Sequence, residues 1–418
     1  MIQLIRGFKD ILPDDIHQWQ HIEQTARNLF ESFGFTEIRP ALLEKTDLFK
    51  RSIGEDTDIV GKEMYTFADR KGDSVTLRPE ATASVVRSYI QHKMYAQDPV
   101  RKLYTIGPMF RRERPQKGRY RQFYQINAEA FGIESPLMDA QLIFMLVKLF
   151  EQLSIDDTTA HINSLGCPEC RPGFKKILAG YLESKKEALC ENCRSRMTRN
   201  PLRVLDCKVP SCRKALDAPP EMTSYLCGEC DRHFTRVKTA LNDYNIPFKL
   251  NKNLVRGLDY YSRTTFEIQT LSLGAQSAIA GGGRYDGLVE MLGGPPHPAI
   301  GFAIGFDRLV ELFTQQPGDK VKGPDVFLAP LGETCEAMAG KWAAELSLSG
   351  IRTEIDFSGK SLKSLMKRAN RLQAGHVLIA GEDEIENGSA ILRNLHTKEQ
   401  VDIPLADLSE TIKMKIKL

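Results

Sequence analysis

The sequence has 418 residues, enough for two or three domains that each bury an apolar core. Hydrophobic residues make up 42% and charged residues 27%, which excludes disordered, collagen-like and low-complexity classes. The formal net charge of +3 is too small to indicate a polyanionic partner by itself. The first residues, MIQLIRGFKD, lack the apolar stretch of a signal peptide, and no run is long enough to span a membrane. We therefore expect a cytoplasmic protein.

Hydrophobic periodicity predicts the first elements. Apolar residues from Ile16 recur every three to four positions, typical of an amphipathic helix, and Gly34 fits its end. Short apolar runs separated by turns follow, and this order predicts an antiparallel sheet. The expected strands are 36–39, 64–68, 74–78, 102–110 and 122–126. A second helix is expected over 137–153.

Eight of the nine cysteines lie in one window of the chain. They form three C-x-x-C pairs and one looser pair: Cys167 and Cys170, Cys190 and Cys193, Cys227 and Cys230, and Cys207 and Cys212. In a chain without an export signal, this spacing favours one or two tetrahedral zinc sites over disulfides. The spacing leaves the pairing of the knuckles open, and it also allows reduced cysteines that remain after the loss of an ancestral site. Cys335 lies apart and is expected to be an ordinary thiol.

The cysteine window differs from the rest of the chain in charge. It contains twelve Lys and Arg against four Asp and Glu between Arg171 and Lys214. We therefore predict an inserted module at 162–240, which interrupts a domain made of 1–161 and 241–318.

The remaining elements predict a second domain. A hairpin is expected from 264–271 and 277–280, and a helix at 306–313. Residues 314–324 have the Pro, Gly and charges of a linker. From Val326, strands alternate with helices, which predicts a separate α/β domain with a largely parallel sheet at 324–418.

The densest chemical signal is the segment RRERPQKGRYR, residues 111–121. Six of its eleven residues are basic, and a loop between two strands would hold several arginines over one ligand. Arginine forks bind phosphate or carboxylate oxygens in pairs, so a phosphate ligand is the expected partner. A solvated charged turn is the alternative.

Two further arginines support the phosphate interpretation. Arg256 lies in LVRGLDYY, and Arg308 in GFAIGFDRLVEL, where Gly301 and Gly305 would let the backbone approach a ligand. Arginines that meet in one pocket could neutralise a triphosphate. Acidic and polar residues near these segments could hold a cationic ammonium group: Glu80, Thr82, Gln125, Glu129, Tyr260 and Tyr261.

Other nucleotide-binding signatures are missing from the sequence. There is no G-x-x-x-x-G-K-[ST], and GGGRYDG fails the G-x-G-x-x-G pattern because Asp286 occupies its last glycine position. The sequence therefore favours neither a P-loop enzyme nor a dinucleotide oxidoreductase.

These segments resemble the class II aminoacyl-tRNA synthetases, and within them the histidyl-tRNA synthetases. MFRRERPQKGRYRQF is similar to motif 2 of the class, PAIGFAIGFDRLVEL to motif 3, and 16–40 to motif 1, which forms the dimer interface. LVRGLDYY and AGGGRYDGL are similar to the two histidine-specific motifs. The resemblance implies an α+β catalytic domain on an antiparallel sheet, a Cys-rich insertion, and a C-terminal α/β anticodon-binding domain.

The resemblance implies roles in ATP binding. Arg111 and Glu113 would grip the α-phosphate and the adenine, Arg308 the γ-phosphate side, and Arg119 would be a second phosphate ligand. Arg256 would contact the α-phosphate and the substrate carboxylate, where other class II enzymes place a metal ion. Arg111 and Arg256 are thus the expected catalytic residues, with Mg²⁺ accompanying ATP.

The resemblance also implies a histidine pocket. Glu80, Thr82 and Gln125 would receive the ammonium group, and Glu129 and Tyr261 the two imidazole nitrogens, with Tyr260 beside them. A neutral imidazole has one donor and one acceptor, so a site that pairs both rejects isosteres that lack them.

The implied activity is the ATP-dependent ligation of L-histidine to tRNA(His) through histidyl-adenylate, by a homodimer. Arg114 and Gln116 are candidates for contacting the acceptor end, and the insertion would approach the acceptor arm.

Two other interpretations are open. One is a catalytically silent synthetase-like regulatory subunit of histidine biosynthesis, although such proteins usually lack the anticodon-binding domain or the histidine motifs, and this chain has both. The other is a zinc-ribbon nucleic-acid-binding protein, which would leave the arginines unexplained.

Overall fold

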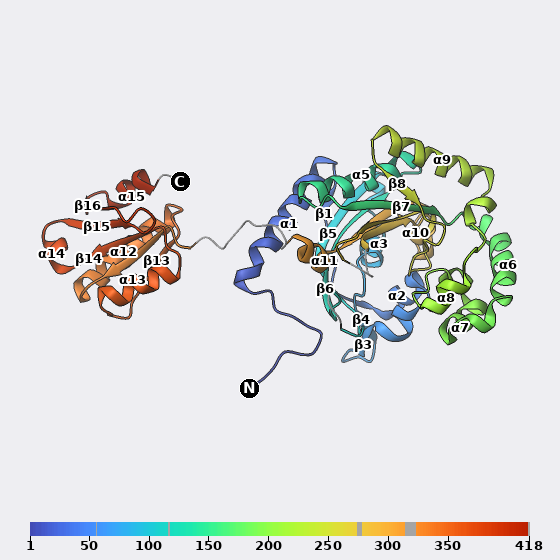
Figure 1. The fold of residues 1–418 in the computed structure, drawn as a ribbon, viewed down its shortest axis with the longest axis horizontal. Helices are drawn as coiled ribbons and strands as arrows, with labels where there is room; N and C mark the ends of the chain where they lie inside the picture. Colours follow the sequence, from blue (N-terminus) through green and yellow to red (C-terminus); the bar gives the residue numbers. More distant parts are fainter. Residues whose placement is uncertain (56, 116–117, 274–277, 314–322, 417–418) are drawn as a thin grey trace. The chain divides into compact units, whose positions relative to one another are not determined.

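The computed structural model describes residues 1–55, 57–115, 118–273, 278–313 and 323–416. The chain forms two compact units, Met1–Pro317 and Gly318–Leu418 (Figure 1). The expected linker falls largely in 314–322 and so lies outside the described residues, as does Ser277 of the expected hairpin. Among the described residues, no helix combines the length and apolarity needed to cross a membrane.

The first unit is built on an eight-stranded sheet with the order β1-β5-β6-β11-β10-β9-β7-β8. Its strands are β1 Thr36–Glu37, β5 Arg101–Phe110, β6 Gln122–Phe131, β7 Thr158–Ser164, β8 Phe248–Leu250, β9 Ser262–Thr270, β10 Ala278–Arg284 and β11 Ala299–Gly305. The six central strands pair antiparallel, which confirms the predicted antiparallel sheet, although the expected strands 64–68 and 74–78 lie in a separate small sheet. The edge strands β1 and β8 pair parallel to β5 and β7, a difference from the expectation. Parallel neighbours require a long crossover, and between β7 and β8 the Cys-rich segment provides it.

Three helices cover one face of this sheet: α1 Pro13–Ser32, α5 Pro136–Gln152 and α9 Gly228–Asp243. Their apolar residues form one core with the strands, including Trp19, Leu146 and Val237. Helix α1 begins before the predicted Ile16 because Pro13 suits a first helical turn.

Shorter elements complete this part of the unit. They are β2 Leu43–Lys45, β3 Tyr65–Ala68 and β4 Ser74–Leu77, which form a small antiparallel sheet, and α2 Thr46–Ile53, η1 Ile59–Glu63, α3 Thr82–Gln91, α4 Met94–Gln97, α10 Leu288–Met291 and α11 Phe306–Phe313.

The Cys-rich segment is helical. It contains α6 Cys170–Glu183, η2 Lys186–Ala188, α7 Glu191–Arg199, η3 Pro201–Val204, α8 Pro210–Ala215 and η4 Met222–Tyr225, and it runs into α9 (Figure 1). Its buried residues share one apolar cluster with Val85 and Val86 of α3 and with Tyr260 and Tyr261. The segment therefore packs directly against the residues predicted to bind a substrate.

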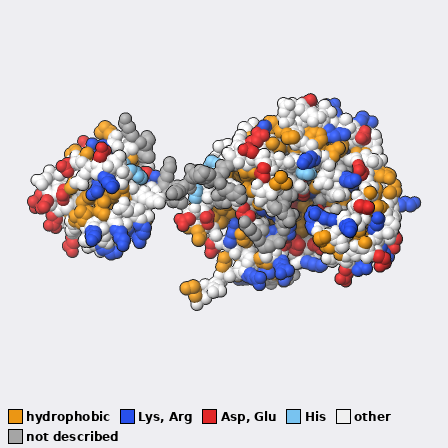
Figure 2. All heavy atoms as spheres, viewed as in Figure 1, with side chains coloured by type: hydrophobic (Ala, Val, Ile, Leu, Met, Phe, Trp, Pro, Cys, Tyr) orange, Lys and Arg blue, Asp and Glu red, His pale blue; other side chains and the backbone are white. Residues whose placement is uncertain are grey.

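The C-terminal unit alternates strands and helices as predicted. Its sheet has the order β13-β12-β14-β15-β16, and its elements are β12 Val326–Pro330, α12 Glu333–Leu348, β13 Thr353–Ile355, α13 Leu362–Arg371, β14 His376–Ala380, α14 Glu382–Glu386, β15 Ser389–Asn394, β16 Gln400–Pro404 and α15 Leu408–Ile416. Strands β12, β13 and β14 are parallel, and β15 and β16 are antiparallel additions. Apolar residues of α12 and α15 form one core cluster, and those of α13 form another. Figure 2 shows Lys and Arg side chains gathered over α13 and acidic ones over α14.

Candidate active site

Strand β6 presents apolar side chains to one face of the large sheet and polar side chains to the other. Ile126 and Ala128 belong to the core beneath α1 and α5. Gln125 and Glu129 lie at the alternate positions, so they point to the opposite face. Burial there is nearly complete for Glu129, which is 1% exposed.

Small residues leave room on this face. We call four of them the glycine floor: Gly281, Gly283, Gly301 and Gly305. In register, Gly301 lies opposite Glu129 and Gly305 opposite Gln125. A Cβ on Gly301 would lie 1.7 Å from a Glu129 oxygen. Each glycine of the floor has a candidate site residue against it: Arg256 at Gly281, Tyr261 at Gly283, Glu129 at Gly301 and Arg308 at Gly305.

Glu129 is a buried acid held by two hydroxyl donors. Thr82 Oγ1, at the start of α3, donates to Glu129 Oε1 at 2.6 Å, and Tyr285 donates its hydroxyl to Oε2. Burial raises the pKa of Glu129 to about 8, although both hydrogen bonds oppose the shift. The site therefore holds a carboxyl group poised to change charge near neutral pH.

Glu80 lies at the N-terminus of α3. Its carboxylate accepts hydrogen bonds from the backbone N–H groups of Thr82 at 2.7 Å and Ala83 at 2.9 Å. A helix N-terminus favours such a carboxylate. Burial raises the pKa of Glu80, and those N–H groups and the charge of Arg111 oppose the rise. Arg111 therefore lies close enough to Glu80 for its positive charge to stabilise the Glu80 carboxylate.

Two tyrosines lie beside these acids. The rings of Tyr260 and Tyr261 have centroids 4.7 Å apart, and Tyr260 meets Tyr285 edge to face at 5.5 Å. Burial, followed by the charges of Tyr261, Glu80 and Glu129, raises the pKa of Tyr260 well above its usual value, so it stays a neutral donor. Gln125 Oε1 is buried and has no hydrogen-bond partner in the described part of the chain.

Arg256 extends over Gly281. Its Nη1 donates to Glu267 Oε1 at 2.6 Å, and its guanidinium lies 5.6 Å from the centre of the Tyr261 ring. Burial alone would lower the pKa of Arg256, but Tyr261, Glu267 and Tyr260 raise it, so the guanidinium stays protonated. Its buried Nε has no partner among the described residues and remains a donor for an anionic ligand.

The basic segment is the loop of the β5–β6 hairpin, as predicted. Arg111 Nε donates to the backbone oxygen of Pro79 at 2.8 Å. Glu113 joins the two ends of the loop, 3.7 Å from Arg111 and 3.0 Å from Arg119. Arg111 is thereby fixed beside the segment that carries Glu80.

The three arginine-bearing segments converge. Arg308 of α11 donates from Nη1 to the backbone oxygen of Ala278 at 2.8 Å. Burial lowers its pKa, Arg119 lowers it further, and Glu113 and Glu267 counteract the shift. Glu113 contacts Arg111, and Glu267 contacts Arg256, so two carboxylates link all three segments.

Comparison with known protein families shows which family this chain belongs to. Residues 7–309 match the family model described as Histidyl-tRNA synthetase. The chain belongs to the histidyl-tRNA synthetase family. Residues 325–415 match the model described as Anticodon binding domain.

Individual histidyl-tRNA synthetases resemble the chain over its full length. It is 60% identical over 413 residues to the histidine–tRNA ligase of Desulforapulum autotrophicum, covering 99% of this chain and 97% of that protein. The histidine–tRNA ligase of Geobacter sulfurreducens is 52% identical over 405 residues, covering 97% and 98%. The crystal structure of apo S. aureus histidyl-tRNA synthetase has a TM-score of 0.83 at 35% identity, covering 99% of this chain and 100% of that chain. The predicted enzyme class, a class II aminoacyl-tRNA synthetase, is confirmed.

Two residues of this histidyl-tRNA synthetase site were missed by the sequence analysis. Glu267, the partner of Arg256, lies in the unremarkable strand sequence FEIQ. Tyr285 donates to Glu129 and is 1% exposed. Its position in AGGGRYDGL was a signal, because a tyrosine that directly follows a glycine-rich strand can reach across the space the glycines leave.

The structure describes one of the two loop residues expected to contact the acceptor end of tRNA. Arg114 is exposed, and Gln116 lies outside the described residues.

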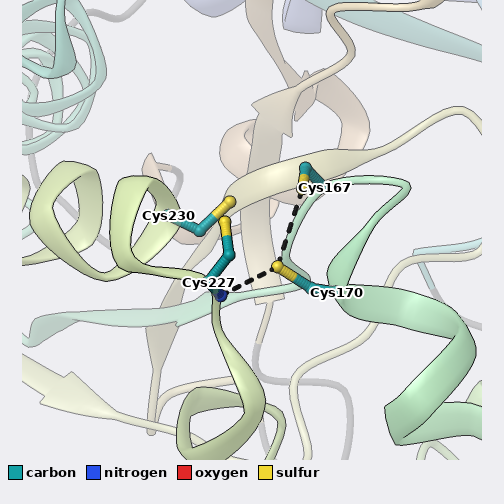
Figure 3. Close-up of side chains that lie close together, drawn as sticks. All are labelled: Cys167, Cys170, Cys227 and Cys230. Carbon is teal, nitrogen blue, oxygen red and sulfur yellow. Dashed lines mark hydrogen bonds between the residues drawn. The ribbon is translucent and has the colours of Figure 1, made fainter.

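The eight clustered cysteines form two groups of four. One contains Cys167, Cys170, Cys227 and Cys230, and the other Cys190, Cys193, Cys207 and Cys212; within each, all sulfurs lie within 4.8 Å of one another. In Figure 3 the first group comes together from the residues around the starts of α6 and α9. All eight are free thiols, and Cys335 is buried separately in the C-terminal unit.

The electrostatics of the clusters suit thiolate ligands. The backbone N–H of Cys230 is the main cause that lowers the pKa of Cys227 to about 7. At Cys190, burial opposes the shift, but N–H and thiol donors lower its pKa to about 7 as well. Burial raises the pKa of Cys193 and of Cys230. Each cluster therefore has one thiol that ionises readily near neutral pH, which is the form that binds a metal.

Proposed function

We propose that this chain activates L-histidine with ATP to form histidyl-adenylate and then transfers the histidyl group to the 3′ end of tRNA(His). The observation that carries the proposal is the convergence of Arg111, Arg256 and Arg308 beside a buried acid pocket on the glycine floor. The arginines on one side of the site suit the phosphates of ATP. The neutral and acidic hydrogen-bond acceptors on the other side suit the ammonium group of an amino acid.

The arginines form the ATP side of the site. Arg111 and Glu113 bind the α-phosphate and the adenine, Arg119 adds a phosphate contact, and Arg308 binds the γ-phosphate side. Mg²⁺ bound with ATP would supply charge neutralisation, and Glu113 and Glu267 are the carboxylates beside the arginines that would hold it.

The acid pocket forms the histidine side. Glu80, Thr82 and Gln125 receive the ammonium group, and the unpartnered Oε1 of Gln125 supports this role. Glu129 and Tyr261 bind the two imidazole nitrogens, with Tyr260 packed beside them. The hydroxyl groups of Thr82 and Tyr285 fix the Glu129 carboxyl, so it meets the ring in one orientation.

Chemistry needs no protein nucleophile. A carboxylate oxygen of histidine attacks the α-phosphorus of ATP, the bond to the bridging oxygen breaks, and pyrophosphate leaves with the electron pair. Arg256 donates its free Nε–H toward the carboxylate and the α-phosphate, where negative charge develops. The terminal tRNA hydroxyl then attacks the activated carbonyl carbon and releases AMP.

The deciding experiment is histidine-dependent ATP–pyrophosphate exchange. Arg256→His should keep the fold and lower exchange by two or more orders of magnitude, because the loss of one preorganised contact to developing charge costs about 2.7–4 kcal/mol. Exchange at the wild-type rate would refute the role of Arg256.

The regulatory alternative predicts no exchange at all. A structure described as an ATP phosphoribosyltransferase regulatory subunit/histidyl-tRNA synthetase from Bacillus halodurans has a TM-score of 0.65 at 18% identity, a likeness of fold alone. The intact arginine and acid groups of this chain favour the enzyme.

We also propose Zn²⁺ in each cysteine cluster. Tetrahedral zinc with Zn–S distances of about 2.3 Å requires sulfurs about 3.8 Å apart. The Cys167–Cys170 sulfurs lie 3.6 Å apart and the Cys190–Cys207 sulfurs 4.0 Å apart, which supports this assignment. Zinc would fix the folds of the loops around it.

The proposal for tRNA places contacts on several parts of the chain. Arg114 and Gln116 would meet the acceptor end, and the basic Cys-rich module would meet the acceptor arm. The C-terminal unit would bind the anticodon through α13, whose exposed side chains include Lys363, Lys367 and Arg371. We assign residues 1–161 and 241–318 to the catalytic domain, 162–240 to the Cys-rich insertion and 324–418 to the anticodon-binding domain. The motif 1 segment, residues 16–40, would form a homodimer interface.

A further inference from the structure

The segment 254–261, which we call the histidine loop, has no helix or strand of its own. It lies between β8 and β9 and carries Arg256, Tyr260 and Tyr261. A loop without ladder hydrogen bonds needs other contacts to hold its side chains in one geometry.

Three side chains of the Cys-rich module supply such contacts. Arg203 Nη1 donates to the backbone oxygen of Arg256 at 3.0 Å. Asn200 Nδ2 donates to Asp259 Oδ1 at 2.7 Å. At the end of the loop, the Nη2 of Arg171 donates to the backbone oxygen of Tyr261.

Each contact originates beside a cysteine cluster. Arg171 directly follows Cys170 at the start of α6. Asn200 and Arg203 lie in the stretch between Cys193 and Cys207, both members of the second cluster. The positions of the donors are therefore set by the folding of the two clusters.

The loop is clamped from the other side as well. The backbone N–H of Asp259 donates to the oxygen of Ile53 at 3.2 Å. Gly257 lies against Arg203, since a Cβ there would be 3.0 Å from its Nη1. A change in the module therefore passes directly to the backbone of Arg256.

We infer that Arg203 and Arg171 are positioning residues for histidine binding, and that the cysteine clusters serve amino-acid activation as well as any contact with tRNA. Arg203 fixes the backbone from which Arg256 reaches the substrate carboxylate, and Arg171 fixes that of Tyr261. This inference rests on the proposed function, because it assigns the positioning residues of the same pocket.

The test is histidine-dependent ATP–pyrophosphate exchange without tRNA, on the full zinc-loaded chain. Arg203→Met should raise the KM for histidine at least fivefold and change the KM for ATP less than twofold. The loop carries three of the residues assigned to histidine binding, whereas Arg256 is its only residue assigned to ATP, and Arg111, Arg119 and Arg308 bind ATP from outside the loop. Arg203→Lys keeps one donor and should recover part of the loss. Arg236→Met, an exposed arginine on α9, is the matched control and should leave both constants unchanged.

Zinc content and the melting temperature exclude a general folding defect. If Arg203→Met does not fold, Asn200→Ala removes the neighbouring contact and should give the same selective rise. An unchanged KM for histidine, or equal changes in both KM values that follow the melting temperature, would overturn the inference. A wild-type chain without exchange would instead end the proposed function, and this inference with it.

Discussion

Arg256 and Glu267 form an ion pair at 2.6 Å, and the guanidinium of Arg256 occupies the space that a side chain at position 281 would fill. Glu267 and Gly281 are register partners on β9 and β10. The sheet therefore provides both the anion that orients Arg256 and the gap that admits it.

Gly281→Ala should fold and lose activity. The added Cβ would lie 2.5 Å from Nη1 and 2.6 Å from Nη2 of Arg256, at the far end of a flexible side chain that can move away. A shift of about 1 Å in a positioned group can cost about 100-fold, so exchange should fall by roughly 10- to 100-fold.

Its matched control is Gly287→Ala in the same motif, where a Cβ meets no atom within 4 Å. That variant should keep the wild-type exchange rate. Equal rates for both variants would contradict the packing of Arg256 on Gly281.

Glu129→Gln should change how stability depends on pH. The folded-state pKa of Glu129 is about 8, raised by burial from its usual 4.5. From pH 4.5 to about 8 the folded chain retains a proton that the unfolded chain releases, so Glu129 contributes less stability as pH rises. Glutamine releases no proton. The melting temperature of the variant relative to wild type should therefore increase between pH 5 and pH 8.5.

The measurement is thermal unfolding without ligands, with Glu290→Gln on the exposed side of α10 as control. A difference between Glu129→Gln and wild type that stays constant with pH would rule out the raised pKa.

Sequence reasoning predicted the elements that have a strong local pattern. The β5–β6 hairpin, the helices α1, α5 and α11 and the alternation after Val326 follow from periodicity over many residues, whereas α3 and α9 were not predicted. A strand at 36–39 was expected, but two paired residues carry no signal for the direction of pairing, and β8 was not predicted because it has only three residues.

Long-range pairing explains what else the sequence could not provide. The spacing within each cysteine pair does not indicate which two pairs share a cluster. Only the path of the chain from α6 to α9 brings Cys167 to Cys227. Glu267 could not be recognised as a site residue from the sequence either. It belongs to the site because it pairs with Arg256, and the fold brings Arg256 against it from a loop.

Loss of one ligand should empty one cluster. The purified chain should contain about two zinc ions, and Cys193→Ser about one, because a structural site requires its full ligand set. Cys193 is fully buried in its cluster, so serine there also leaves a poor ligand in a closed site. Elemental analysis measures the content, and Cys335→Ser should keep both ions. Less than about 0.2 zinc per wild-type chain would discard the zinc assignment.

Phe357 should contribute to tRNA binding and not to histidine activation. Its side chain is 68% exposed in the loop that leads from β13 to α13, next in sequence to the helix with exposed Lys363, Lys367 and Arg371. An exposed aromatic ring beside cations is typical of single-stranded RNA recognition, where stacking on one base contributes about 1–3 kcal/mol. Phe357→Ala should therefore raise the KM for tRNA in aminoacylation by roughly 5- to 100-fold.

Histidine-dependent exchange separates this effect from damage to the fold, because it needs no tRNA and should stay at the wild-type rate. Leu348→Ala is the matched control. Leu348 is 90% exposed at the end of α12, which belongs to a different core cluster from α13. If Leu348→Ala raises the KM for tRNA as much as Phe357→Ala does, the anticodon surface does not lie beside α13.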